Sequence, residues 1–164
     1  SVAPISHADF YCAVLDRMAD RVGGLYGVVA HSMGASWVAR AMVHGLAVER
    51  LALLSPVVYF RKVFDLFLAQ TGASKPVLER FVDYFVRFEG PDCFAAWSPI
   101  HTLQNCKATG LLLHAANDAM ISSQDANELA RVWGTLQTVS GRDHQSILKD
   151  PVAVKAAVSA MIKA

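Results

Sequence analysis

LYGVVAHSMGASWVARAMVHG, residues 25–45, is the stretch that decides the fold. Residues 25–30 form a short apolar run with two adjacent valines, which predicts a buried β-strand. A helical pattern follows over residues 35–44 and ends at Gly45. A buried strand that leads almost directly into a helix is the building unit of an α/β sheet.

The same alternation continues to the end of the chain. Three more short apolar runs predict strands, and the stretches around them have helical spacing. The strands are expected at 51–54, 110–115 and 136–139, and the helices at 9–22, 63–70, 76–88, 122–132 and from Pro151 onward. This order indicates a parallel sheet with helices on both faces. We therefore expect an α/β fold and a single domain over residues 1–164.

The composition limits the classes of molecule that the protein is expected to bind. The chain has 164 residues, of which 54% are hydrophobic and 18% charged, and its net charge is +1. No cluster of Lys and Arg exceeds a pair such as Arg61-Lys62, so we expect no nucleic-acid binding. The apolar runs are too short to span a membrane. Cys12, Cys93 and Cys106 lack metal-ligand spacing and are typical of reduced thiols in a cytoplasmic protein.

Residues 56–98 interrupt the alternation with helices and no strand, and they hold ten of the fifteen aromatic residues. Phe81, Tyr84, Phe85 and Phe88 follow i, i+3, i+4, i+7 spacing, which is typical of a helix face packed on a core. On a lid, the same face would cover an apolar substrate. We interpret residues 56–98 as a helical, aromatic lid insert.

Ser32 stands at the turn between the first predicted strand and its helix. Strand and helix backbones pass close together at such a turn, and the small residues Ala30 and Gly34 flank it. The N–H of Met33 and the positive end of the helix would face an oxyanion formed by attack on a carbonyl. Two interpretations fit: Ser32 is a nucleophile, or it only caps the helix.

A serine nucleophile needs a base, and the base needs an orienting carboxylate. Asp118 follows the strand predicted at 110–115, and His144 follows the strand at 136–139. Since parallel strands end at one edge of the sheet, both side chains should lie near Ser32. Asp125, within a predicted helix, and Asp143, beside His144, are weaker candidates for the acid. Singly, Asp118 could be a turn residue and His144 a surface residue.

Other reactive side chains lack a suitable context. His7, His44, His101 and His114 share no ligand spacing, so we expect no metal site. Neither Cys93 nor Cys106 stands at a strand-to-helix turn like that of Ser32, so we interpret both as buried apolar residues rather than nucleophiles. No cofactor is expected.

Four features together resemble the α/β-hydrolase superfamily, in its bacterial serine-esterase or lysophospholipase-like branch. They are AHSMG, LLLHAANDAMIS, GRDHQSILKDP and the aromatic insert, and the resemblance covers residues 25–162. It implies that Ser32 is the nucleophile, His144 the general base, Asp118 its acid and Met33 an oxyanion donor. The substrate pocket would be lined by His31, Phe60, Phe64, Phe85 and Trp97.

The chain departs from this family in two respects. Ala30 replaces the first glycine of the family's turn, a small-for-small change. The family also begins with several strands, one of which supplies a second oxyanion N–H, so the chain resembles only its C-terminal portion. We therefore expect strand 25–30 to have an unpaired edge that pairs with a preceding segment or another copy, or that aggregates. An isolated, soluble, active monomer is not expected.

These observations predict a serine hydrolase that cleaves carboxylic esters bearing an apolar acyl or alkyl group, through an acyl-enzyme. A small-molecule ester would be its partner. Two alternatives stay open: a non-catalytic fragment or interaction module, or the same fold performing acyl transfer or C–C hydrolysis.

Overall fold

A computed structural model describes residues 7–162 of the chain, and the side chains of residues 10–162. Four parallel strands form one sheet in the order β1-β2-β3-β4. The strands are β1 (Leu25–His31), β2 (Val48–Leu54), β3 (Thr109–Ala115) and β4 (Thr135–Val139). The α/β class and the parallel sheet predicted from the sequence are confirmed.

The register brings the carboxyl ends of all four strands to one edge of the sheet. His31 lies opposite Leu54, Leu54 opposite Leu113, and Ala115 opposite Val139. The loops that leave these ends therefore start side by side, as is usual for the active sites of open parallel sheets.

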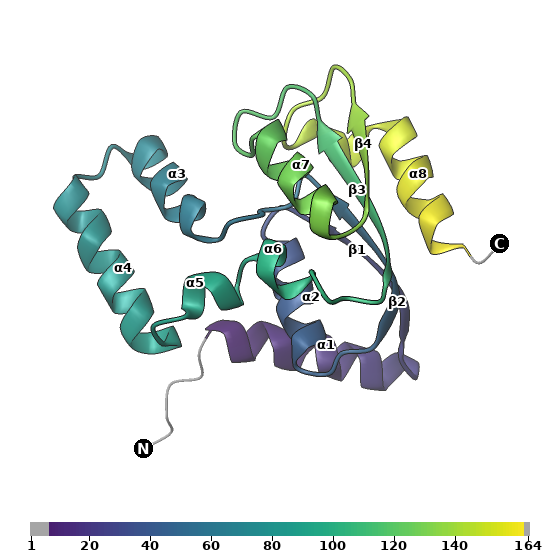
Figure 1. The fold of residues 1–164 in the computed structure, drawn as a ribbon, viewed down its shortest axis with the longest axis horizontal. Helices are drawn as coiled ribbons and strands as arrows, with labels where there is room; N and C mark the ends of the chain where they lie inside the picture. The colour runs from purple at the N-terminus through teal and green to yellow at the C-terminus, as the bar shows by residue number, and fades with distance from the viewer. Residues whose placement is uncertain (1–6, 163–164) are drawn as a thin grey trace.

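Helices cover both faces of the sheet (Figure 1). Helix α8 (Pro151–Met161) lies on one face, and α2 (Gly34–Val43) and α7 (Ser123–Val132) lie on the other. Alternate side chains of β2 point to the two faces: Leu51 and Leu53 join the α2 and α7 side, and Ala52 and Leu54 the α8 side. Helix α1 (His7–Val22) packs on α2.

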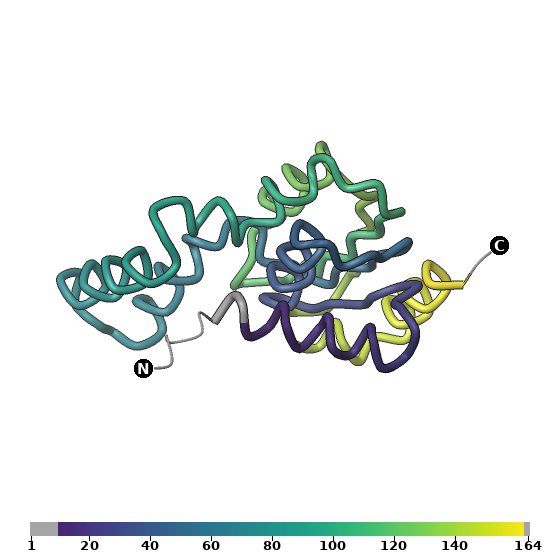
Figure 2. Tube along the Cα trace, turned by 90° about the horizontal axis from the view of Figure 1, so that it is seen from below, coloured from purple at the N-terminus to yellow at the C-terminus, as the bar shows by residue number. Residues whose placement is uncertain are grey.

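The segment between β2 and β3 extends away from the sheet, as Figures 1 and 2 show. It contains α3 (Arg61–Thr71), α4 (Lys75–Glu89), α5 (Cys93–Ala96) and α6 (Pro99–Thr102). Gly72, with φ 65°, ends α3 in the left-handed conformation that glycine adopts without steric cost. The segment has its own apolar cluster, centred on Phe60, Phe64 and Trp97.

Most helix and strand ends lie within two residues of the sequence-based bounds, and the larger differences are the following. Strand β2 begins at Val48 rather than residue 51, because Val48 and Arg50 already pair with Leu25 and Gly27 of β1. The short helices α5, α6 and η1 (Ser146–Lys149) were not predicted, since four residues carry too little periodicity.

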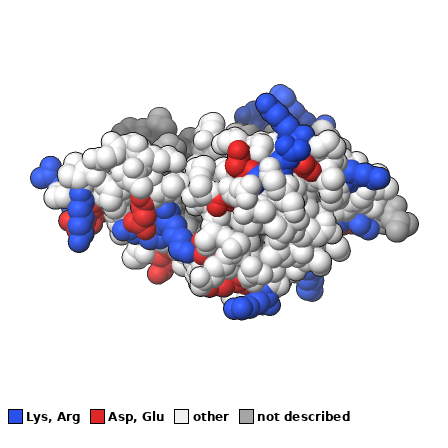
Figure 3. All heavy atoms as spheres, turned by 90° about the horizontal axis from the view of Figure 1, so that it is seen from above, with Lys and Arg blue, Asp and Glu red and all other residues white. Residues whose placement is uncertain are grey.

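Charged side chains are sparse and of mixed sign on the face seen in Figure 3. None of the helices within residues 7–162 is both long and apolar enough to cross a membrane.

Candidate active site

Ser32 has a left-handed backbone, with φ 53°, at the turn from β1 into α2. A residue other than glycine in this region stores on the order of 1–3 kcal/mol of strain and needs its surroundings to hold it. The end of β2 does so: the Ser32 N–H donates to the Leu54 carbonyl at 3.1 Å, and the Val57 N–H donates to the Ser32 carbonyl at 3.2 Å.

The small residues around this turn are in ordinary contact. A Cβ added at Gly34 would lie 3.7 Å from the Cβ of Ala30, a normal van der Waals distance. The turn therefore accommodates Ala30 in place of glycine, and it is not at its steric limit.

The Ser32, His144 and Asp118 side chains form one hydrogen-bonded line, which we call the Ser–His–Asp cluster. The Nε2 of His144 lies 2.9 Å from the Oγ of Ser32, and its Nδ1 lies 2.9 Å from the Oδ2 of Asp118. The side chain of His144 is 5% exposed and that of Asp118 is 0% exposed. Because a carboxylate only accepts, Nδ1 carries the proton, which leaves Nε2 to accept from the serine hydroxyl.

The structure does not show Ser32 capping helix α2 through its side chain. Helix α2 has Met33 at its N-cap, without a side-chain cap bond. The Ser32 hydroxyl bonds to His144 instead.

Asp118 is surrounded by hydrogen-bond donors. Its Oδ1 accepts the N–H groups of Met120 and Ile121, each at 2.9 Å. Burial raises the pKa of the Asp118 carboxyl, but hydrogen bonds from Ile121, His144, Ser55 and Met120 outweigh it and hold the pKa below its ordinary value. Asp118 is therefore an ionised carboxylate at neutral pH and fits the part of an orienting acid.

Ser55 is a member of the site that the sequence analysis missed. It directly follows β2, is fully buried, and has φ 40°, so neighbouring strands each end on a serine with left-handed backbone. Its Oγ accepts the Ala115 N–H at 3.4 Å, and its hydroxyl is one of the causes that lower the pKa of Asp118. The signal was present as the Ser55-Pro56 pair after a buried strand, one strand away from the Ser32 turn.

The loop that carries His144 is fixed at both ends. The N–H of Asn117 donates to the Arg142 carbonyl at 2.9 Å, which ties the loop to the segment that carries Asp118. The Nε of Arg142 donates to Asp150 at 2.7 Å, and Asp150 also caps α8 through the N–H groups of Val152 and Ala153.

The two weaker acid candidates lie elsewhere. Asp125 is buried and faces Lys62, whose Nζ lies 2.6 and 2.8 Å from its carboxylate oxygens. Asp143 accepts the N–H groups of Gln145 and Ser146 within its own loop. Neither contacts the ring of His144.

Two cavities lie beside the Ser–His–Asp cluster. The first, of about 160 Å³, is lined by Ser32, Met33, Lys62 and Asp125 among others. The second, of about 280 Å³, is lined almost wholly by aromatic side chains, and Phe60, Phe64, Phe85 and Trp97 are among them. Met33 and Val63 line both, so the aromatic cavity adjoins the space in front of Ser32.

His31 is placed differently from the sequence-based prediction. It lines neither of these two cavities but does line a third, of about 600 Å³, that runs along β1. Its ring is turned to the His144 loop, where Nε2 lies 2.8 Å from the carbonyl oxygen of His144.

The aromatic residues predicted to share one helix face of the lid, Phe81, Tyr84, Phe85 and Phe88, differ in burial. Phe85 is half-buried and contacts Phe60 and Phe64, with ring centroids 5.6 and 5.2 Å apart. Tyr84 and Phe88 are exposed and contact each other.

The N–H of Met33 is available to an oxyanion: no acceptor within residues 7–162 takes it. Met33 stands at the N-terminus of α2, where the helix dipole adds a positive field.

No metal-binding cluster of His, Cys, Asp or Glu occurs among the described residues. The side chain of His7 lies outside them. Burial raises the pKa of the Cys93 thiol, which makes Cys93 a poor nucleophile.

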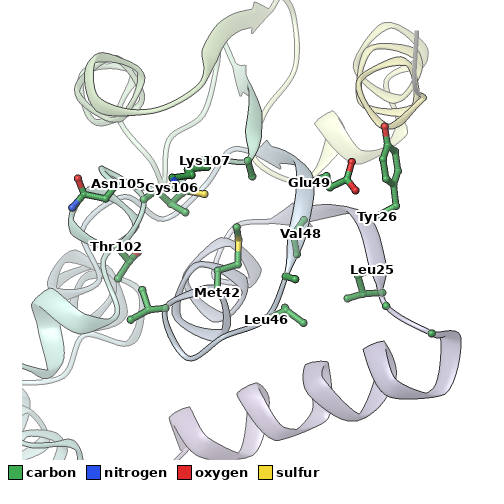
Figure 4. A pocket seen from close by; sticks show the side chains of 16 residues that line it. Leu25, Tyr26, Met42, Leu46, Val48, Glu49, Thr102, Asn105, Cys106 and Lys107 are labelled. Atoms are coloured by element: carbon green, nitrogen blue, oxygen red, sulfur yellow. The ribbon is translucent and has the colours of Figure 1, made fainter.

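A larger hollow, of about 750 Å³, lies at the amino ends of the strands, away from Ser32 (Figure 4). It is lined by Leu25 and Val48, at the amino ends of β1 and β2, and by the segment around Cys106. The seven residues of β1 span roughly 20 Å, which separates this hollow from Ser32.

No protein-family model matches this chain, and no curated protein sequence does. Solved structures do. A bromoperoxidase from Bacillus anthracis is 14% identical, with a TM-score of 0.65 over 98% of this chain and 76% of its own. MGS-MChE2, an α/β hydrolase enzyme from a metagenome of lagoon sediments of Mar Chica, Morocco, is 12% identical (TM-score 0.65; 96% and 71%). The monoacylglycerol lipase of Paleococcus ferrophilus is 14% identical (TM-score 0.63; 98% and 77%).

Likeness at such low identity shows a fold and leaves the chemistry to the site. The parallel sheet, the helices on both its faces and these structural neighbours agree. The chain has the fold of the α/β-hydrolases.

Proposed function

We propose that this protein is a serine hydrolase of carboxylic esters, with Ser32 as nucleophile, His144 as general base and Asp118 as its orienting acid. One observation carries the proposal: Nε2 and Nδ1 of His144 lie 2.9 Å from Ser32 and 2.9 Å from Asp118, at a strained turn that heads a helix. A buried line of this kind activates a hydroxyl for acyl transfer.

The reaction has two halves. The Oγ of Ser32 attacks the ester carbonyl carbon while its proton passes to Nε2 of His144, and Asp118 stabilises the imidazolium. The oxyanion faces the Met33 N–H. The bond to the alcohol oxygen then breaks, and His144 protonates the leaving alcohol. Water attacks the acyl-serine with His144 as base, and the acid leaves with Ser32 restored.

The aromatic cavity is the reason to propose a substrate with an apolar acyl or alkyl group. It adjoins Ser32 through Met33 and Val63 and offers rings at van der Waals range. Residues 56–98 then act as a lid over it. Two polar contacts tie this lid to α7: Lys62 with Asp125, and the Tyr59 hydroxyl, which donates to Glu128 at 2.6 Å.

Hydrolysis of p-nitrophenyl acetate and p-nitrophenyl octanoate tests the proposal. We expect both to be cleaved by the wild type, octanoate with the lower KM, and neither by Ser32→Ala. Ser36→Ala is the matched control, because Ser36 is buried on α2 and its hydroxyl has no partner among the described residues. Activity that survives in Ser32→Ala would show that Ser32 is not the nucleophile, and no activity in the wild type would support a non-catalytic module instead. Methanolysis that outpaces hydrolysis would favour acyl transfer.

We also infer that the free side of β1 pairs with a second copy of this chain. Within the described residues β1 has a neighbouring strand on one side only. Its residue Val29 is 50% exposed. A hollow of about 600 Å³, lined by Val14, Met18 and Val29, runs between α1 and this strand. Unpaired strand edges with apolar surroundings template association. Light scattering should show a mass that rises with concentration and falls in Val29→Lys; a monomer at all concentrations would contradict this.

The location we propose is the cytoplasm, where the thiols of Cys12, Cys93 and Cys106 stay reduced.

A further inference from the structure

His31 is the last residue of β1 and directly precedes Ser32. It is half-buried, and its ring lies 4.8 Å from the ring of His144, centroid to centroid. Its Nε2 is 2.8 Å from the main-chain carbonyl oxygen of His144, 113 positions away in the sequence.

The geometry fixes which nitrogen carries the proton. A carbonyl oxygen only accepts, so Nε2 of His31 must be the donor. Burial lowers the pKa of His31, the bond to the His144 carbonyl raises it, and the electrostatic effects of the nearby His144 and Asp118 side chains act in opposite directions. The net shift is downward, so at neutral pH His31 is an uncharged Nε2–H donor.

His144 is thereby held at three points. Its ring bonds to Ser32 and to Asp118, and its main chain bonds to His31. Within residues 10–162, His31 is the one side chain that hydrogen-bonds the main chain of His144. Since His31 and Ser32 are neighbours, the same turn positions both the nucleophile and the loop that carries its base.

We propose that His31 is a positioning residue for His144: its Nε2–H holds the main chain of the loop at the distance from which Nε2 of His144 reaches Ser32. The inference rests on the proposed function only for its kinetic consequence. The positioning itself concerns the free protein.

Three variants test it. His31→Phe keeps a ring and removes the donor, and His31→Gln removes the ring but keeps an N–H at similar reach. His44→Phe is the control, because His44 is an exposed histidine at the end of α2. With p-nitrophenyl acetate, we expect kcat of His31→Phe to fall about tenfold, the equivalent of one hydrogen bond, with KM within about twofold. His31→Gln should recover most of the loss, and His44→Phe should match the wild type.

A second readout is independent of turnover. In the ¹⁵N-histidine NMR spectrum, His144 of the wild type should be the Nδ1–H tautomer, and His31→Phe should mix its tautomers. If the wild type hydrolyses no ester but the tautomer of His144 still depends on His31, the proposed function fails and the positioning stands. Unchanged kcat and an unchanged His144 spectrum in His31→Phe would overturn the inference. An equal loss of thermal stability in His31→Phe and His31→Gln would also overturn the inference, because it would not depend on the N–H donor.

Discussion

The Ser–His–Asp cluster and the helical insert meet at Ser32 but are built differently. The cluster comes from strand ends, and hydrogen bonds of fixed direction hold it: the Asp118 carboxylate by itself accepts from two N–H groups and from a ring nitrogen of His144. The insert is held by aromatic contacts, such as Phe60 on Trp97 at 5.2 Å, and by two polar ties to α7.

The difference separates two tasks. A directional network tolerates little displacement, so it suits the groups that must transfer a proton. Apolar packing is non-directional and tolerates substitutions of similar volume, so it suits the surface that selects a substrate. We therefore expect substitutions in the cluster to change kcat steeply, and substitutions in the insert to change KM modestly.

The largest effect should come from removing the nucleophile or the base. Ser32→Ala and His144→Ala are each expected to lower kcat by on the order of 10⁴- to 10⁶-fold, and the double variant no further, because the groups act as a unit. Stopped assays with p-nitrophenyl acetate measure this. Losses that multiply in the double variant would show that the two residues work separately. His101→Ala, on the exposed surface of α6, is the control.

Asp118→Asn should also lower kcat, but its loss should be about tenfold to a hundredfold smaller than that of Ser32→Ala or His144→Ala, since Asp118 orients His144. The structure also predicts that Asp125→Asn behaves differently. It breaks the pair with Lys62 and leaves His144 untouched, so it should lower thermal stability while kcat for acetate stays near the wild-type value. Equal losses of kcat in both variants would undo the assignment of Asp118.

In the insert, Phe64→Leu should raise KM for p-nitrophenyl octanoate about five- to tenfold, the equivalent of roughly 1 kcal/mol of ring contact. KM and kcat for acetate should hardly change. Phe88→Leu is the matched control, because Phe88 is 44% exposed and lines no cavity next to Ser32. An equal rise in KM for acetate would show that Phe64 supports the fold rather than the substrate.

The smallest effect concerns pH. The pKa of Asp118 in the folded protein lies below its ordinary value, so its ionised form stabilises the fold at neutral pH, and this contribution is lost as the pH falls through the folded-state pKa. Ser55→Ala removes one cause of the lowered folded-state pKa, so the loss should be smaller and should be complete at a higher pH than in the wild type. Melting temperatures between pH 3 and pH 7, about the range of ordinary carboxyl titration, measure this. Ser36→Ala should leave the profile unchanged.

The sequence was sufficient for features that depend on local pattern. The alternation of apolar runs and helical stretches predicted the parallel sheet, and the placement of Ser32, Asp118 and His144 after three of its strands predicted which side chains meet. The contact of His31 with the His144 main chain and the place of Ser55 beside Asp118 could not be predicted, because they join residues 113 and 63 positions apart, which only the packed sheet brings together. The short helices α5 and α6 carried too few residues for a periodic signal.

The central claim is that His144 activates Ser32. Labelling with a fluorophosphonate, followed by mass spectrometry of the digested chain, tests it without a guess about the substrate. The account predicts one adduct, on Ser32, which forms far more slowly in His144→Ala and at the wild-type rate in Ser36→Ala. No adduct, or an adduct on another serine, would contradict it.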